Sequence, residues 1–178
     1  MARIATKRAT GMALTVVLLA SCAGLEGSGG PVGNGFEGRY HNARSSLEAG
    51  NYGSAIRGYK AMIGNAGPLD SRLRLELAHA YLRADSYDDA IREATIVASA
   101  HADNRRAAAL AVLGTAHHRL AQEAMSRGDF GQGTIYHLSR AKAALDEMLV
   151  SNADLDPLGS MAQRRDMAAA SLRNLGRA

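Results

Sequence analysis

The sequence predicts an all-α fold built from helical hairpins, and three observations lead to this prediction. Hydrophobic residues make up 47% of the chain but aromatic residues only 4%, with no Trp, which suits closely packed helices better than a β-sheet. The segment 50–56 (GNYGSAI) returns 35 residues later as 85–91 (DSYDDAI). Each copy lies between two amphipathic runs, and a fixed period of this size indicates a helical repeat array.

The spacing of apolar residues predicts where the helices lie. Leu73, Leu77 and Tyr81 fall on one face of a helix, and Pro68 ends the helix before it because proline cannot continue one. The third turn comes at Gly128, about two helical turns late, which predicts an elongated hairpin; two shorter helices around a functional loop are the alternative. The expected helices are 39–49, 52–65, 71–84, 87–100, 104–126, 133–151 and 158–174.

The last of these helices is expected to cap the array, since an uncovered terminal hairpin would expose its apolar face. Its apolar side should face the preceding hairpin, and its charged side should face water. The apolar side consists of Leu158, Met161, Ala162, Ala169 and Leu172, and the charged side of Arg164, Arg165 and Asp166.

The N-terminus is typical of a bacterial lipoprotein signal. A basic start at Arg3, Lys7 and Arg8 precedes the apolar core 11–20, which is too short to span a bilayer. The core ends in LASC at 19–22, and this is the only Cys in the chain. We therefore expect a signal peptide at 1–21 and a lipidated Cys22. An ordinary secretory signal with an incidental Cys is the alternative.

Residues 22–38 are expected to be a flexible tether between the lipid and the folded domain, because 23–38 holds seven Gly and one Pro. Acyl chains on Cys22 would anchor the chain stably. Lipoproteins resembling this one tend to stay in the inner membrane when Asp follows the lipidated Cys. Here Ala23 follows it. We expect the outer membrane, with the domain facing the periplasm; the periplasmic face of the inner membrane is the alternative.

The basic charge of the chain is mostly a property of its signal. The formal net charge is +4, but three basic residues and no acidic residue precede Cys22. The remainder has 18 basic and 17 acidic residues. This near balance gives no argument for a nucleic-acid partner.

The repeated segments resemble the tetratricopeptide repeat, a family that pairs two helices in each unit. Its units place small residues where the helices cross and a large residue in the turn. The resemblance covers 39–157, as units 39–69, 70–103 and 104–157, with a cap and tail at 158–178. A plain Ala-rich helical bundle is the alternative. The positions that match the family's packing residues are Ala43, Tyr52, Ala55, Tyr59, Leu77, Ala78, Tyr81, Tyr87, Ala90, Leu113 and Gly114.

The resemblance also implies a binding groove lined by the first helix of each pair. Its Arg content suits an acidic or carboxylate-ended peptide, because Arg pairs bidentately with carboxylates. Solvated arginines on helix surfaces are the alternative reading. The implied groove residues are Tyr40, Arg44, Leu47, Arg72, Leu75, His79, Arg83, Thr115, His118 and Arg119.

No pattern in the sequence points to catalysis, a metal or a cofactor. His117 and His118 are adjacent, so on a helix they point about 100° apart and are poorly placed to share a metal. His117 takes the position of a packing aromatic in the repeat. No serine lies in a Gly-x-Ser-x-Gly turn. We therefore expect neither an enzyme nor a metal protein.

The expected function is that of a membrane-anchored periplasmic adaptor that binds protein or peptide ligands. The chain resembles small repeat lipoproteins of the bacterial envelope, among them TadD-type and pilotin-type lipoproteins of pilus assembly. This resemblance implies a role in a pilus, secretion or other envelope machine. A self-associating structural lipoprotein and a regulator of a cell-wall enzyme are the alternatives. The sequence leaves the oligomeric state open.

Overall fold

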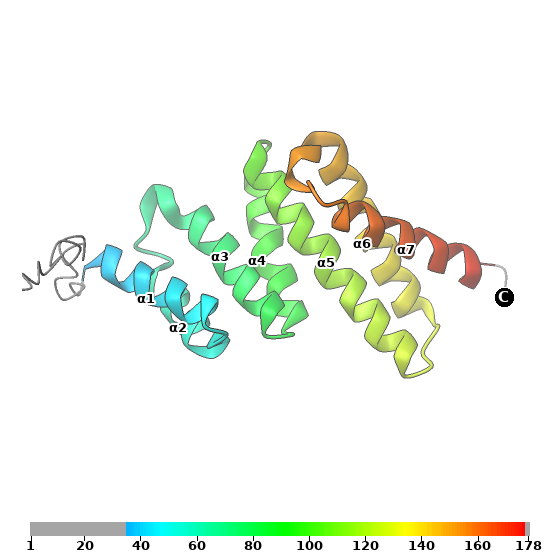
Figure 1. Ribbon diagram of the computed structural model, residues 1–178, viewed down its shortest axis with the longest axis horizontal. Helices are drawn as coiled ribbons and strands as arrows, with labels where there is room; N and C mark the ends of the chain where they lie inside the picture. The colour runs from blue at the N-terminus through cyan, green and yellow to red at the C-terminus, as the bar shows by residue number, and fades with distance from the viewer. Residues whose placement is uncertain (1–34, 177–178) are drawn as a thin grey trace, which may run out of the picture. The chain divides into compact units, whose positions relative to one another are not determined.

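The computed structural model describes residues 35–176, and all regular structure in this range is helical (Figure 1). The prediction of an all-α fold is confirmed for this part of the chain. The expected signal peptide and residues 22–34 of the expected tether, including Cys22, lie outside the described residues. The helices are α1 (Phe36–Glu48), α2 (Tyr52–Met62), α3 (Asp70–Arg83), α4 (Tyr87–Ala100), α5 (Asn104–Ser126), α6 (Gln132–Ser151) and α7 (Ser160–Leu175), with short 3-10 helices η1 (Gly67–Leu69) and η2 (Ala153–Leu155).

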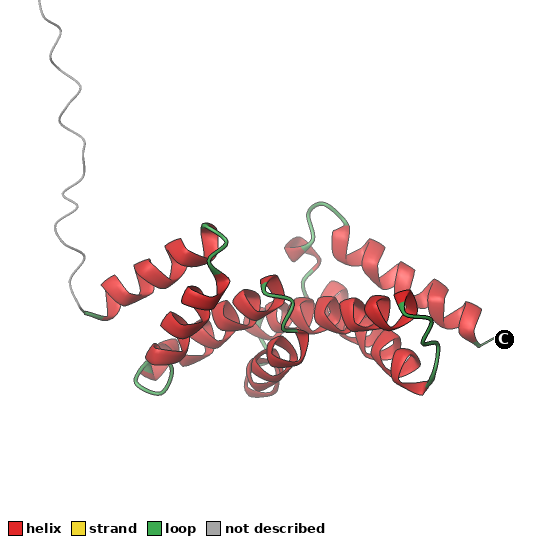
Figure 2. Cartoon of the chain, turned by 90° about the horizontal axis from the view of Figure 1, so that it is seen from below, coloured by secondary structure: helices red, strands yellow, loops and turns green. Residues whose placement is uncertain are grey.

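Helices α1 to α6 form three hairpins that follow one another, and α7 packs on the last (Figures 1 and 2). Each of α2, α4 and α6 packs against the helix before it and the helix after it. Helix α5 also packs against α3 and α7. Helix α3 therefore lies beside α5, and α5 lies beside α7. None of the described helices is long and apolar enough to cross a membrane.

The three hairpin turns share one geometry. In each, a residue with positive φ ends the first helix, and the next N–H donates to the carbonyl five residues earlier, as in a Schellman motif. The positive-φ residues are Gly50 (78°), Asp85 (56°) and Gly128 (78°). The matching hydrogen bonds run from Asn51 N to Ser46 O at 2.8 Å, from Ser86 N to Tyr81 O at 3.0 Å and from Asp129 N to Ala124 O at 2.9 Å. Asp is one of the few residues besides Gly that tolerate this conformation, which explains Asp85.

Ten of the eleven expected packing residues are buried: Ala43, Ala55, Tyr59, Leu77, Ala78, Tyr81, Tyr87, Ala90, Leu113 and Gly114. Small residues allow close contact within the hairpins. A Cβ at Gly58 of α2 would lie 2.8 Å from the Cβ of Ala43 in α1. The exception is Tyr52, which is half-buried and lies beneath a guanidinium group instead of plugging the core.

The third hairpin is elongated, and the alternative of two shorter helices around a loop is wrong. Helices α5 and α6 are continuous over 23 and 20 residues. Their added length carries a second small core, in which Ala121, Leu138 and Ala141 meet Ala168 of α7. The elongation therefore gives α7 a surface to pack on.

Several helix boundaries differ from the expected ones. Helix α1 begins at Phe36, inside the expected tether, because the Phe36 side chain packs against the core. Helix α2 ends at Met62, three residues early, because Gly64 has a φ of 97°. Helix α7 begins at Ser160, after Gly159 with a φ of 69°. Leu158 consequently lies outside the helix and is 91% exposed instead of packed. Arg164 and Arg165, expected to face water, are half-buried.

Candidate functional site

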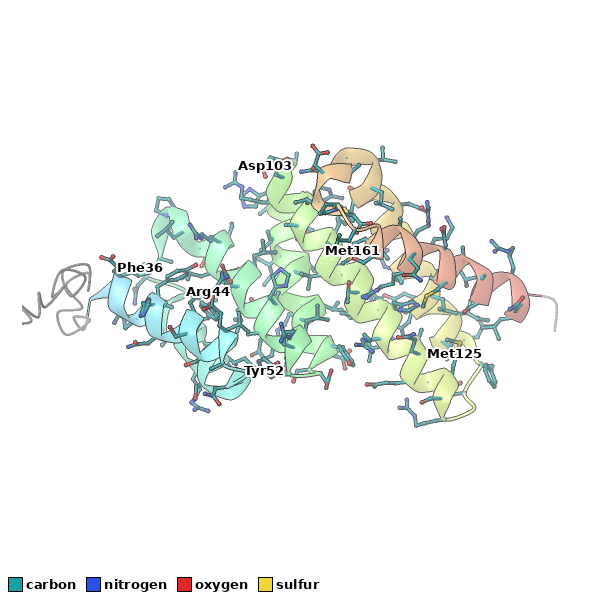
Figure 3. The ribbon with its side chains drawn as sticks, viewed as in Figure 1. Phe36, Arg44, Tyr52, Asp103, Met125 and Met161 are labelled. Atoms are coloured by element: carbon teal, nitrogen blue, oxygen red, sulfur yellow. The ribbon has the colours of Figure 1, made fainter. Side chains whose placement is uncertain are left out.

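Six of the ten expected groove residues lie together around one cleft of about 460 Å³ between α1 and α3. Figure 3 places Arg44 of α1 on the side of that helix that faces α3. The cleft combines cationic side chains with two leucines. The six residues are Arg44, Leu47, Arg72, Leu75, His79 and Arg83, and Glu76 completes the lining.

Glu76 was not among the residues expected from the sequence, and its carboxylate forms a salt bridge with Arg44. The Arg44 guanidinium pairs with Glu48 at 2.7 Å and with Glu76 at 3.1 Å. The hydrogen bond to Glu48 and the charge of Glu76 raise the pKa of Arg44. The Tyr40 hydroxyl also donates to Glu76 at 3.2 Å. Arg44 is therefore a structural link between α1 and α3, and the free positive charge of the cleft comes from other arginines.

Arg72 and Arg83 supply that charge. Each guanidinium lies over a tyrosine ring, Arg72 over Tyr40 at 5.5 Å and Arg83 over Tyr52 at 5.4 Å from the ring centroid. Each also donates to a tyrosine hydroxyl, at 3.3 Å and 3.1 Å respectively. Within residues 35–176, neither forms a salt bridge. The rings hold the two cations in place, and neither cation is neutralised by a direct carboxylate partner.

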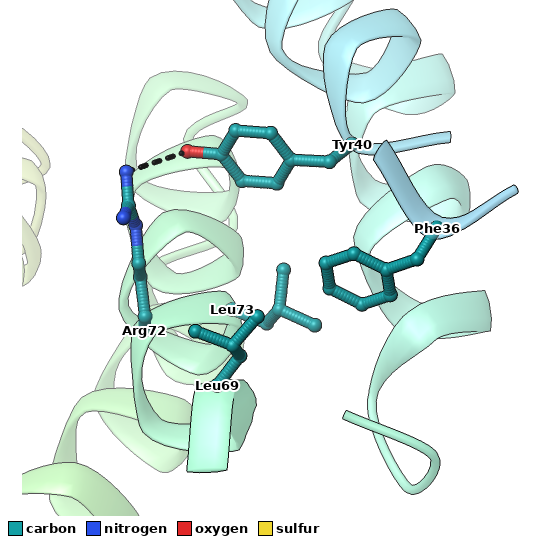
Figure 4. Close-up of a pocket in the computed structure, with 5 residues that line it drawn as sticks. All are labelled: Phe36, Tyr40, Leu69, Arg72 and Leu73. Carbon is teal, nitrogen blue, oxygen red and sulfur yellow. Dashed lines mark hydrogen bonds between the residues drawn. The ribbon is translucent and has the colours of Figure 1, made fainter. Parts of the chain in front are cut away.

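A small apolar pocket of about 110 Å³ adjoins this cleft (Figure 4). Phe36, Leu69 and Leu73 line it together with Tyr40 and Arg72. Arg72 thus borders both the pocket and the cleft. Phe36 and Leu69 were not expected here, because Phe36 falls in a Gly-rich segment and Leu69 in a turn. In the sequence, Pro68 and Leu69 only mark the end of a helix, which does not indicate that Leu69 lines a pocket.

The expected groove does not continue in the same form over α5, because α7 packs on that helix. The Thr115 hydroxyl lies 3.7 Å from the sulfur of Met161. Figure 3 labels Met161 near the start of α7. His118 is only 4% exposed. Of the expected groove residues on α5, Thr115 is therefore half-buried against α7, and His118 is buried and does not line the α1/α3 cleft. Arg119 remains exposed, but it lines a different cleft, between α5 and α7.

The histidines show no metal arrangement among the described residues, where no group of three His, Cys, Asp or Glu is placed to hold an ion. His117 is buried, as a packing residue would be, and its Nδ1 lies 2.9 Å from Nδ1 of His137 in α6. Burial, together with the neighbouring His137 and Arg140, lowers the pKa of His117 to about 4. The neutral ring can share one hydrogen bond with His137 inside the hairpin.

Comparison of the chain with protein-family models, with curated proteins and with solved structures finds no match.

Proposed function

We propose that this chain is a lipid-anchored adaptor of the tetratricopeptide-repeat type, without a catalytic role, that holds acidic peptide segments of envelope proteins in its α1/α3 cleft. Its place would be on the periplasmic face of the outer membrane, in a pilus, secretion or other envelope assembly machine. The observation that carries the proposal is the pair Arg72 and Arg83, two guanidinium groups that lie over tyrosine rings and form no salt bridge in the described part of the chain.

The repeat part of the proposal is supported by the recurrence of one turn geometry at residues 50, 85 and 128. It is also supported by the contact of α5 with α3, which makes the first helices of the second and third pairs adjacent. The lipoprotein part is supported by the sequence at 19–22 alone.

The acidic nature of the ligand follows from the charges of the cleft. Guanidinium groups form strong bidentate hydrogen bonds with carboxylates. Leu47 and Leu75 in the cleft and the apolar pocket beside Arg72 offer surface to hydrophobic side chains of the same segment. A peptide that combines Asp or Glu with large apolar residues is therefore the best complement.

Replacing both free arginines, as Arg72→Gln with Arg83→Gln, is expected to weaken binding of a labelled Glu- and Leu-rich peptide by about 10- to 100-fold. Fluorescence anisotropy on the full chain in detergent measures this, and added salt should weaken the wild-type interaction. Arg92→Gln on α4 is the matched control, since Arg92 is exposed and already paired with Asp89 at 2.6 Å. A Lys- and Leu-rich peptide that binds equally well would contradict the proposal.

Cys22→Ala is expected to move the protein from the membrane fraction to the soluble periplasmic fraction. One acyl chain binds membranes only weakly, whereas the several chains of a lipidated Cys hold a protein stably. Fractionation followed by immunoblotting measures the distribution. Ser28→Ala, which leaves residues 19–22 intact, is the control and should stay with the membrane. Membrane attachment of the Cys22→Ala protein would rule out the lipid anchor.

A further inference from the structure

A second cleft, of about 310 Å³, lies between α5 and α7 and is separate from the α1/α3 cleft. Its lining is polar on both sides except for Met167 of α7, and the two clefts share no residue. Helix α5 contributes His118, Arg119 and Gln122, and α7 contributes Ser160, Gln163 and Arg164.

Arg164 is the unusual residue of this cleft. It is half-buried, and its Nη1 is fully buried without a hydrogen-bond partner in the described structure. Burial and the charge of Arg119 lower the pKa of Arg164, and the charge of Asp156 acts in the opposite direction. A buried donor on a charged group that lacks a partner costs free energy. If Arg164 served only for packing, an apolar residue at this position would cost less free energy.

Arg119 adds a second cation to the same cleft. Neither Arg119 nor Arg164 forms a salt bridge within residues 35–176. Both cations also affect His118, because burial and the charges of Arg164 and Arg119 lower the pKa of its ring to about 4. Two like charges thus line the same cleft beside a neutral histidine.

We infer that the α5/α7 cleft binds an oxyanion, a carboxylate or phosphate group, between the guanidinium groups of Arg119 and Arg164. Guanidinium groups are the preferred partners of both oxyanions because their N–H donors match two oxygens at once. The Gln122 and Gln163 amides line the same space as neutral donors, whereas the Ser160 hydroxyl there donates to Asp156 at 3.2 Å. The site does not depend on the proposed peptide cleft, since it involves none of its residues.

Titration of the full chain in detergent with inorganic phosphate at constant ionic strength tests this inference. Phosphate should raise the melting temperature in a concentration-dependent way, because a ligand that binds only the folded state stabilises it. Arg119→Gln and Arg164→Gln should each weaken the apparent phosphate affinity at least about 10-fold. Arg164→Gln removes an unpartnered charge, so its melting temperature without phosphate should not fall.

Two controls and a second probe make the outcome specific. Arg173→Gln, at an exposed residue of α7 outside the cleft, and the Arg72→Gln, Arg83→Gln double variant should keep the full phosphate response. A Glu-rich peptide that stabilises the chain through Arg119 and Arg164 would identify a peptide carboxylate as the source of the oxyanion. A response to phosphate alone would identify a phosphate group. The inference is overturned if neither probe stabilises the wild type, or if both variants respond as the wild type does.

Discussion

Gly114→Ala is expected to destabilise the fold by about 1–3 kcal/mol, because the third hairpin has no room for a methyl group at this position. A Cβ on Gly114 would lie against Leu145 of α6, 2.7 Å from its Cδ2 and 3.2 Å from the backbone carbonyl oxygen of Ala141. Leu145 is fully buried, and a backbone oxygen cannot rotate away. The two helices must therefore separate, or Leu145 must leave its position in the core.

Gly133→Ala is the matched control for this prediction. Gly133 also lies in a helix, α6, but a Cβ there would meet nothing within 4 Å. Ala is a better helix former than Gly by about 1 kcal/mol, so this variant should be neutral or slightly more stable. Urea unfolding followed by circular dichroism measures both. Equal stability of the two variants would contradict the close crossing of α5 and α6 at Gly114.

Lowering the pH from 7 to 4 is expected to cost the fold on the order of 3 kcal/mol or more through two buried histidines. The pKa of His117 is lowered to about 4 by burial, His137 and Arg140, and that of His118 to about 4 by burial, Arg164 and Arg119. The unfolded chain takes up protons on these rings near pH 6.5, whereas the folded chain does so only near pH 4. Stability is therefore complete above pH 7 and falls between pH 6.5 and 4.

The double variant His117→Gln, His118→Gln separates this effect from the titration of carboxylates. Its unfolding free energy should be lower at pH 7 but should change less between pH 6.5 and 4.5 than that of the wild type. His41→Gln, at an exposed residue of α1, is the control and should keep the wild-type slope. Guanidinium chloride unfolding at fixed pH values gives the comparison. A wild type with constant stability over this range would contradict the burial of the two neutral rings.

The turns and the small packing residues could be predicted from the sequence because both depend on local chemistry. Gly50 and Gly128 mark positive φ angles, and the segment that holds Asp85 repeats the pattern around Gly50. Ala55 and Ala90 recur at the same distance from their turns and are both fully buried. Such positions are specified by spacing along one chain segment, which a sequence displays directly.

The contacts between distant residues that shape the two clefts could not be predicted in the same way. Glu76 pairs with Arg44, a residue 32 positions away, and nothing in the spacing of the two marks the pair. Phe36 was assigned to the tether because Gly dominates its neighbours, although its ring packs on the core. The burial of His118 and Arg164 depends on the side of α5 that α7 covers. The second small core around Ala168, to which α5, α6 and α7 contribute, determines which side of α5 is covered.

The central claim is that the α1/α3 cleft holds an acidic segment of an envelope protein, and crosslinking from inside the cleft tests it most directly. A photoreactive benzoylphenylalanine replaces Leu75, which lines the cleft, or Ile96, which is exposed on α4, in the full chain expressed in the cells that make it. We predict a discrete adduct from position 75 only, through an Asp- or Glu-rich peptide, and its loss with Arg72→Gln and Arg83→Gln. An absent adduct at 75, equal adducts at 75 and 96, or an adduct that persists without both arginines would contradict the claim.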